Sequence, residues 1–350
     1  MAVFNQEGWN AGKINFGKAV NSGDQFTMLN KGKRALKVKS VSFGTNNFES
    51  SIAAGTEIAV GEGITFNLQF NAGESAKAID DVMTVEFESG SKVTFPVSGE
   101  GLASDVLFYG FEMNALDYDW KKDFTTIDVD RKVTHQLGYY QTIIEDDGGR
   151  IAFTQAQHYN NNLKAHSGIG TLAAASPDDQ TAANDWLISK QITPTEGATF
   201  DFYARNLSTN ASVFVGDNDL HSVEVLVSEA GNTKTTDFKA VMNPTEMAYL
   251  GENQWHHFNV DLSAYAGKKI YVAVRHTTNS ASFLAFFDDF TFNHVGNADQ
   301  TGIECVKNIT SEDAPVAVYN LNGVQVANGN QKGMYIIKTA NGKTVKVIRK

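Results

Sequence analysis

The sequence predicts an all-β protein: an immunoglobulin-like sandwich, then a jelly-roll β-sandwich, then a small C-terminal β unit. Three observations predict this class. Apolar and polar residues alternate at every second position along most of the 350-residue chain, Gly and Asn punctuate the alternating segments, and helical spacing is almost absent. Because 42% of the residues are apolar, disorder throughout is excluded, and the length suits two or three domains.

Residues 1–103 are expected to form the first sandwich. Short alternating segments, each with one apolar and one polar face, are typical of half-buried strands. They are separated by turn sequences, and their spacing within about 100 residues indicates an antiparallel sandwich. The expected strands include residues 35–41, 64–70, 83–87 and 92–95.

Residues 104–295 repeat this pattern with longer strands and longer loops. About 190 residues of this kind favour a jelly roll. A long loop covers residues 146–185, and a short helix is expected within 177–186. The expected strands include residues 197–205, 222–228, 257–262, 269–276 and 282–292.

The end of the chain divides into a linker and a small unit. Residues 296–313 are polar, as in a linker, and residues 314–350 alternate again. Asn322-Gly323 and Asn341-Gly342 predict tight hairpin turns, because type I′ turns need positive φ at both central residues.

Charge and composition exclude several functions. The chain carries a net charge of −11, concentrated in residues 104–295 with 25 acidic and 13 basic residues. This balance favours cations and makes nucleic acid a poor partner. No apolar run approaches the roughly 18–20 residues of a membrane helix, so a membrane-spanning protein is not expected. The single cysteine, Cys305, allows neither an intrachain disulfide nor a cysteine metal cage.

The first 103 residues resemble the immunoglobulin-like choice-of-anchor D module. That resemblance implies a domain that spaces and displays other domains and carries no chemistry. It depends on residues 14–17, 30–32, 36–38, Phe48, Gly61, 66–70 and the closing Val-Ser-Gly-Glu-Gly at 97–101.

The central region resembles the cleaved-adhesin or choice-of-anchor J domain of gingipain-type haemagglutinin adhesins. The resemblance implies a jelly-roll binding module similar in shape to carbohydrate-binding modules. The matching motifs follow the family's order: Phe111-Glu112, Trp120, 126–130, 185–189, Trp255, 260–267 and Phe-Asp-Asp-Phe at 287–290.

The tail is similar to the C-terminal sorting domain of type IX secretion cargo. This similarity implies export across an outer membrane, although the first residues lack the basic start and apolar stretch of a signal peptide. The protein is therefore cytosolic or its leader has been removed, and the tail favours the second. The matching segments are 318–323, 332–337 and the basic end 346–350.

Calcium is the cofactor that the acidic residues suggest, since it prefers several carboxylate and carbonyl oxygens. In the resembled jelly roll the first and last strands are neighbours, so Glu112 is expected to meet Asp288 or Asp289, with Asp128 and Asp130 as further metal candidates. A structural calcium there is one interpretation. Ordinary solvated or hydrogen-bonded acids at strand ends are the other.

Ligand contact is predicted for aromatic residues in or beside loops, because a flat ring packs well on the apolar face of a sugar. The candidates are Trp120, Tyr139, Tyr140 and Tyr159. His166 lies in the long loop with no visible partner, and we expect it to be an isolated residue.

Together these features predict a secreted or surface-attached bacterial adhesin-like protein that recognises a host extracellular protein or glycan without catalysis. No catalytic residues are nominated, because the Gly-x-Ser-x-Gly, His-Glu-x-x-His and phosphate-loop motifs are missing. Two alternatives stay open: a carbohydrate-binding accessory module of a polysaccharide-utilisation system, and a hydrolase of unknown type. The sequence leaves the oligomeric state open.

Overall fold

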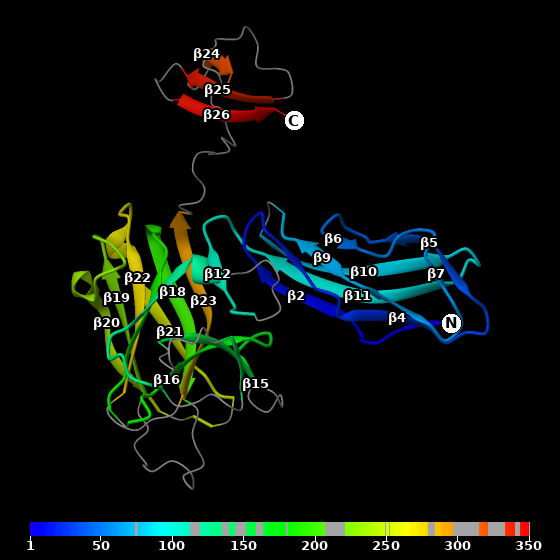
Figure 1. Cartoon of the computed structure of the whole chain (residues 1–350). Coiled ribbons are helices and arrows are strands. Elements are labelled where there is room, and N and C mark those ends of the chain that lie inside the picture. The colour runs from blue at the N-terminus through cyan, green and yellow to red at the C-terminus, as the bar shows by residue number, and fades with distance from the viewer. Residues whose placement is uncertain are drawn as a thin grey trace. The chain divides into compact units, whose positions relative to one another are not determined.

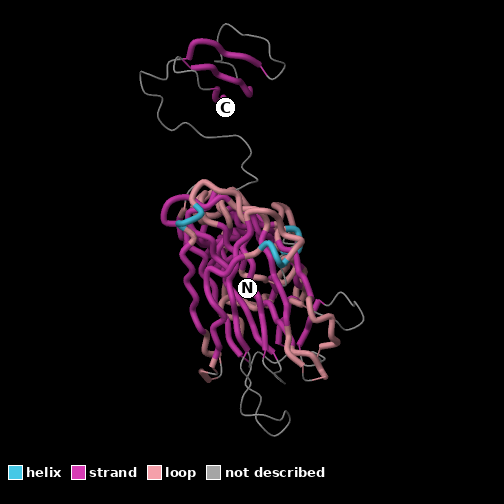
Figure 2. Tube along the Cα trace, turned by 90° about the vertical axis from the view of Figure 1, so that its left-hand side faces the viewer, coloured by secondary structure: helices cyan, strands magenta, loops and turns pink. Residues whose placement is uncertain are grey.

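We describe a computed structural model of the chain, which is all-β (Figures 1 and 2). It comprises two compact units, Met1–Gly296 and Asn297–Lys350. Helical structure among the described residues is limited to short 3-10 turns, and none of it is a helix long and apolar enough to cross a membrane. The structure describes residues 1–73, 76–112, 120–134, 140–143, 152–158, 164–179, 181–206, 221–248, 250–251, 253–278, 284–296, 315–320, 333–339 and 344–349.

The N-terminal sandwich pairs a five-stranded sheet with two three-stranded sheets. The five-stranded sheet runs in the order β2 (Trp9–Ile14), β11 (Lys92–Gly101), β10 (Lys77–Phe87), β5 (Leu36–Ser42), β7 (Glu57–Ile58). One three-stranded sheet has the order β1 (Ala2–Phe4), β4 (Phe26–Asn30), β8 (Gly63–Phe66). The other three-stranded sheet has the order β3 (Ala19–Asn21), β9 (Leu68–Asn71), β6 (Phe48–Ser50). The pair β2–β11 is parallel, which alternation alone does not reveal.

Phenylalanine rings fill the centre of this sandwich. Phe26, Phe66 and Phe95 are at most 1% exposed, and the centroid of Phe26 lies 5.2 Å from that of Phe95. The strand expected at 64–70 divides at Asn67, whose backbone N–H donates a hydrogen bond to the Ser51 hydroxyl oxygen. The break lets β8 and β9 join different sheets and turn their apolar residues into one core.

The jelly roll has two sheets (Figure 1). One contains β14 (Tyr140–Ile143), β15 (Thr154–His158), β16 (Thr171–Ala175), β23 (Leu284–Gly296), β18 (Thr193–Asn206) and β21 (His256–Asp261), with β12 (Leu107–Tyr109) also paired to β23. The other contains β13 (Phe124–Asp128), β17 (Asn184–Ser189), β22 (Tyr271–Thr278), β19 (His221–Ser228) and β20 (Lys239–Met247). The pairing of β12 with β23 confirms that the first and last strands are neighbours.

Residues 198–204 of β18 and 290–293 of β23 alternate between buried and less buried positions and build the centre of the jelly-roll core. Phe200 and Phe202 of β18 and Phe290 and Phe292 of β23 are at most 1% exposed, and the rings of Phe200 and Phe292 stack 4.4 Å apart. Because side chains in a strand alternate between faces, the intervening residues of β18 point to the opposite side of the sheet. That side carries the polar face described below.

The helix expected within 177–186 is not present among the described residues of that range. Pro177 instead forms a bridge with Thr134, and β17 begins at Asn184. β17 lies between β13 and β22 and forms backbone hydrogen bonds with both strands. This strand pairing overrides the local helical preference.

The second unit contains a three-stranded antiparallel sheet of β24 (Pro315–Asn320), β25 (Gly333–Thr339) and β26 (Thr344–Arg349). These strands match the alternation predicted for the tail. The two Asn-Gly turns and the polar linker lie outside the described residues.

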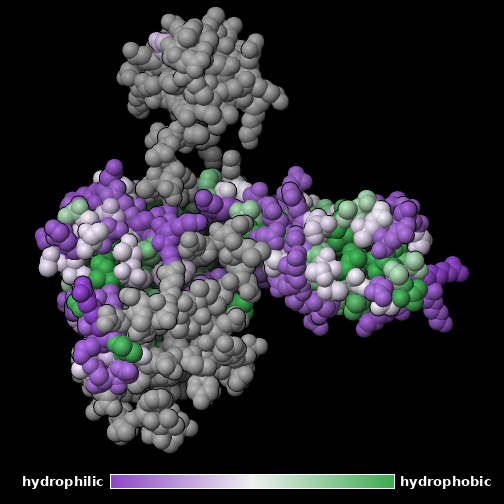
Figure 3. Space-filling view, in the orientation of Figure 1, coloured by the Kyte–Doolittle hydropathy of each residue, from purple (hydrophilic) through white to green (hydrophobic). Residues whose placement is uncertain are grey.

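The described surface is largely hydrophilic or neutral in the view of Figure 3, with some apolar side chains reaching the surface of the N-terminal sandwich. Exposed large apolar residues there include Val60 and Val82. Single apolar residues of this kind are normal on a soluble protein and do not by themselves mark a site.

Candidate functional site

The loop at residues 166–170 binds two adjacent acids of β23. The backbone N–H of His166 donates to Asp288 Oδ2 at 2.8 Å, and that of Ser167 donates to the same oxygen at 3.3 Å. The Ser167 hydroxyl donates to Asp289 Oδ1 at 2.6 Å, and His166 Nδ1 lies 2.6 Å from Asp289 Oδ2. Both oxygens of Asp289 therefore have partners within one loop.

His166 is not the isolated residue that the sequence predicts. Besides contacting Asp289, its ring stacks on Tyr203 with centroids 3.5 Å apart and an interplanar angle of 13°. Trp255 approaches the same ring edge-on at 5.8 Å. The stacking anchors the loop to the sheet, and only the fold brings these residues together.

Glu112 is held by the other end of the same loop. Its Oε2 accepts the backbone N–H groups of Ile169 and Gly170 at 2.9 and 3.2 Å. Gly168 has φ +59°, and a Cβ on it would overlap Glu112 Oε1, so the close approach requires glycine. Burial, followed by the charge of Asp289, raises the pKa of Glu112 to about 7 despite these two donors.

The fold thus gathers Glu112, Asp288 and Asp289 around one loop, as the sequence predicts. Burial and then the charge of Asp289 raise the pKa of Asp288 well above its usual range. Several of their oxygens accept hydrogen bonds from N–H and hydroxyl donors of the loop, and among the described residues these three acids do not bring one oxygen each within 4.8 Å of one another. These hydrogen bonds agree with the second interpretation left open by the sequence, in which the acids are hydrogen-bonded.

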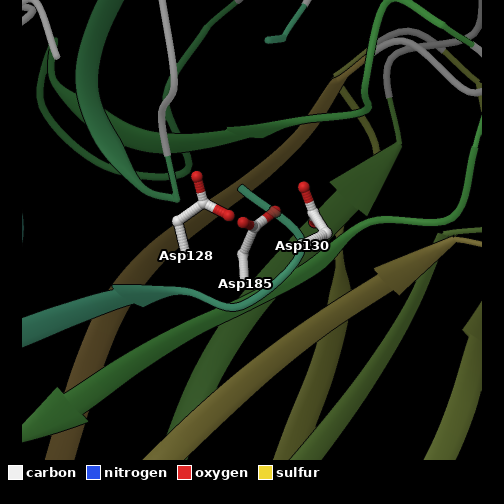
Figure 4. Close-up of side chains that lie close together, drawn as sticks. All are labelled: Asp128, Asp130 and Asp185. Carbon is white, nitrogen blue, oxygen red and sulfur yellow. The ribbon is translucent and has the colours of Figure 1, made fainter. Parts of the chain in front are cut away.

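A second acidic group has the geometry of a metal site (Figure 4). Asp128 and Asp185 are cross-strand partners on β13 and β17, and Asp130 follows in the turn after β13. One carboxylate oxygen from each lies within 4.8 Å of the others, and no other such group of three occurs among the residues that the structure describes. Figure 4 shows the three carboxylates directed toward a common region.

Backbone donors orient two of these acids. The N–H of Arg131 donates to Asp128 Oδ1 at 2.6 Å, and the N–H of Asn184 donates to Asp130 Oδ2 at 2.6 Å. Arg131 has φ +55°, so the turn is tight. Three carboxylates in one place suit a hard cation such as calcium, so the residues present fit that ion.

Asp185 is the member that sequence reasoning missed. It is 2% exposed, and burial, then the charges of Asp130 and Asp128, raise its pKa well above the usual range. An ionisable residue directly before the apolar run Trp186-Leu187-Ile188 was a usable signal, because buried acids need a partner.

Two buried histidines extend from Asp185. His276 Nδ1 lies 3.1 Å from Asp185 Oδ2, and His276 Nε2 lies 2.7 Å from His221 Nδ1. Both rings are 0% exposed. Burial lowers the pKa of His276 to about 3, and burial with the neighbouring ring lowers that of His221 well below its usual value.

Trp120 does not fit its predicted role in ligand contact. Its side chain is 3% exposed, and its ring packs 6.2 Å from that of Phe111 and 6.4 Å from that of Phe124. It belongs to the core because η1 (Trp120–Lys122) lies directly before β13. Tyr139 and Tyr159 lie outside the described residues, and for Tyr140 the structure describes only the backbone as the start of β14.

An outward face of three adjacent strands carries hydrogen-bonding and aromatic side chains that the sequence did not single out. We call it the outer β18 face. Asp201 accepts from Asn259 Nδ2 at 2.7 Å and Asn293 Nδ2 at 3.0 Å, and His257 Nε2 lies 3.1 Å from it. The sequence did contain a signal for this face, because Asp201 and Tyr203 alternate with the buried Phe200 and Phe202 along β18. The face is defined by Thr199, Asp201, Tyr203, His257, Asn259 and Asn293.

The geometry defines a β-sandwich protein with an acidic cluster and a polar sheet face. No family model matches the sequence, and no curated protein matches it. Among solved structures, the chain is similar to the K1 cleaved adhesin domain of Lys-gingipain from Porphyromonas gingivalis W83, with 19% identity, TM-score 0.37, and coverage of 54% of this chain and 97% of that one. The K3 domain of the same protein gives 19% identity, TM-score 0.35, and coverage of 53% and 96%. TmCBM61, solved in complex with β-1,4-galactotriose, gives 11% identity, TM-score 0.30, and coverage of 53% and 99%.

Proposed function

We propose that this chain is a secreted or surface-attached bacterial recognition protein whose jelly roll binds a host extracellular protein or glycan without catalysis. The observation that carries the proposal is the outer β18 face. Its side chains are joined by hydrogen bonds before any ligand arrives, so little side-chain entropy remains to be lost on binding. Tyr139, Tyr140 and Tyr159, which the sequence predicts for ligand contact, are part of the same proposal.

The chemistry of this face suits hydroxyl-rich or peptide ligands. His257 and Asn259 are exposed, and the rings of Tyr203 and His257 stack 4.7 Å apart. Carboxamides both donate and accept hydrogen bonds, so Asn259 and Asn293 can each bond Asp201 and a ligand at once. A rigid sheet holds these groups at fixed spacing.

Calcium is the cofactor that we propose, held by Asp128, Asp130 and Asp185. The ion would offset the repulsion of three carboxylates, one of them buried, and would tie the turn after β13 to β17. We assign it to these residues rather than to Glu112, Asp288 and Asp289, because among the described residues only Asp128, Asp130 and Asp185 bring one carboxylate oxygen each within 4.8 Å of the others.

An array of glycans and extracellular matrix proteins tests the function. In millimolar calcium we expect binding to a subset of spots, and we expect His257→Ala with Asn259→Ala to weaken it about tenfold or more, as interface anchors do. Thr245→Ala, an exposed change on β20, is the matched control. Absence of binding to every spot, or turnover of a printed glycan, would contradict the proposal.

The second unit is proposed to be the export signal. Its three-stranded sheet belongs to the compact unit Asn297–Lys350, so a deletion within this unit removes no strand of the two sandwiches. Deletion of residues 314–350 is expected to retain the protein in the periplasm, measured by cell fractionation and surface labelling. Surface delivery at the full-length level would refute this role.

A further inference from the structure

The outer β18 face is built around one carboxylate whose polar neighbours all donate to it. Asp201 Oδ1 accepts from Asn259 Nδ2 at 2.7 Å and lies 3.1 Å from His257 Nε2. Its Oδ2 accepts from Asn293 Nδ2 at 3.0 Å and from the Thr199 hydroxyl at 2.9 Å. We infer that this network turns hydrogen-bond acceptors toward the ligand, so that the face selects uncharged, hydroxyl-rich glycans and rejects anionic ones. The inference rests on the proposed binding function of the same face.

The register of three adjacent strands brings these side chains together. The strands lie in the order β23, β18, β21 within one sheet (Figure 1). Asp201 of β18 lies opposite Asn259 of β21, and Thr199 of β18 lies opposite Asn293 of β23. Because neighbouring strands are about 4.8 Å apart, the carboxylate of Asp201 reaches an amide on each side.

The direction of each carboxamide follows from the chemistry of Asp201. A carboxylate only accepts hydrogen bonds, whereas a carboxamide has a donor end and an acceptor end. Nδ2 of Asn259 and of Asn293 must therefore face Asp201, because the reverse orientation would set two acceptor oxygens against each other. Nδ2 of Asn293 also donates to the Thr199 hydroxyl at 3.1 Å, so both of its N–H groups are used.

The groups that remain for a ligand are mainly acceptor oxygens. Among the described residues, neither Oδ1 of Asn259 nor Oδ1 of Asn293 has a hydrogen-bond partner. Asn259, which is exposed, also keeps one N–H group that its bond to Asp201 does not use. Hydroxyls both donate and accept, so neighbouring sugar hydroxyls can pair with this oxygen and this N–H together. A lysine ammonium only donates and would leave the N–H group unmatched, which favours a glycan over a basic protein segment.

An anionic group at this face would meet the same oxygens and the charge of Asp201. Carboxylate and sulfate oxygens only accept, so they cannot pair with Oδ1 of either amide, and like charges placed together oppose binding. Arg205, on the same side of β18, does not supply a compensating positive charge to the face. It is only 4% exposed, its guanidinium lies over the rings of Trp255 and Phe286 at 4.8 and 5.2 Å, and it donates to the Lys164 carbonyl at 3.2 Å.

Binding to matched pairs of glycans tests the inference. Each pair consists of a neutral oligosaccharide and the same oligosaccharide carrying a sulfate or a terminal carboxylate, printed beside the extracellular matrix proteins. The full-length protein is applied at pH 8, where histidine side chains are ordinarily neutral, and calorimetry in solution gives the dissociation constants of the pairs that bind. We expect the neutral members to bind at least about tenfold more tightly than their anionic partners.

Asp201→Asn tests the origin of this preference. Asparagine has the size of aspartate but replaces one acceptor oxygen with an amide donor, so a neighbouring carboxamide can reverse and present its N–H groups to the ligand. We expect neutral glycans to bind more weakly and the affinity ratio of neutral to anionic members to fall toward one. Asp237→Asn, at an exposed acid of η2 (Thr235–Asp237), removes the same charge elsewhere and should leave the ratio unchanged.

Asn259→Ala is the second variant if Asp201→Asn does not fold. It removes one outward acceptor at an exposed position and leaves Asp201 in place. We expect it to weaken the binding of neutral members about 2–10-fold and to lower the same affinity ratio.

The outcomes separate this inference from the proposed function. Binding to no glycan and no protein would refute the proposed function, and the inference with it. Binding to proteins alone would leave the proposed function standing and overturn the inference. Anionic members that bind as well as neutral ones, or better, would also overturn it. So would equal affinity ratios in wild type and Asp201→Asn, or equal changes in Asp201→Asn and Asp237→Asn.

Discussion

Replacing Phe290 with alanine is expected to lower the free energy of unfolding of the jelly roll by about 4 kcal/mol. Phe290 is 0% exposed, and its ring centroid lies 5.1 Å from that of Phe111, 5.2 Å from Phe200 and 5.5 Å from Phe202. It therefore joins strands β18 and β23 to the segment after β12. Removing the ring leaves a cavity that these neighbours cannot close without moving the sheet.

Urea unfolding followed by tryptophan fluorescence measures this effect, with hydrogen exchange of the β18 and β23 amides assigning the transition to this sandwich. Phe258→Ala is the matched control, because Phe258 is only partly buried at the side of the same core. A loss below about 0.5 kcal/mol, the usual range for surface changes, would show that Phe290 is not central to the core.

Raising the pH from 5 to 8 in the presence of a chelator is expected to destabilise the protein through Glu112. The pKa of Glu112 is raised from its ordinary 4.5 to about 7 in the folded protein. Between these values the folded state holds a proton that the unfolded state has released, so the free energy of unfolding falls as pH rises. The effect amounts to about 3 kcal/mol, is absent below pH 4.5, and is complete above about pH 7.

The variant Glu112→Gln isolates this contribution. Glutamine keeps an oxygen that accepts the N–H groups of Ile169 and Gly170 but does not ionise, so we expect a flatter stability profile between pH 5 and 8. Glu246→Gln, a change at an exposed acid of β20, should leave the wild-type slope unchanged. Thermal unfolding across this pH range measures both variants. An unchanged slope in Glu112→Gln would contradict the burial argument.

The strands were predictable from the sequence because their signal is local. A strand buried on one face must alternate, and for that reason Phe200 and Phe202 of β18, and Phe290 and Phe292 of β23, lie at alternate positions. The pairing of β12 with β23, and hence the meeting of Glu112 with Asp288 and Asp289, followed from the jelly-roll resemblance. The split at Asn67 was not predictable, and neither was the lack of a helix among the described residues of 177–186, because partner strands decide both.

The candidate sites depended more heavily on tertiary structure. Alternation indicates which residues share a face of one strand, but it does not show which residue of another strand lies opposite. Asp128 and Asp185 meet through the register of β13 and β17, and His276 reaches Asp185 through the register of β17 and β22. The sequence alone therefore determined the fold class and the position of the buried apolar faces. Only the pairing of distant strands, set by backbone hydrogen bonds across the sheets, decided which acids and histidines lie together.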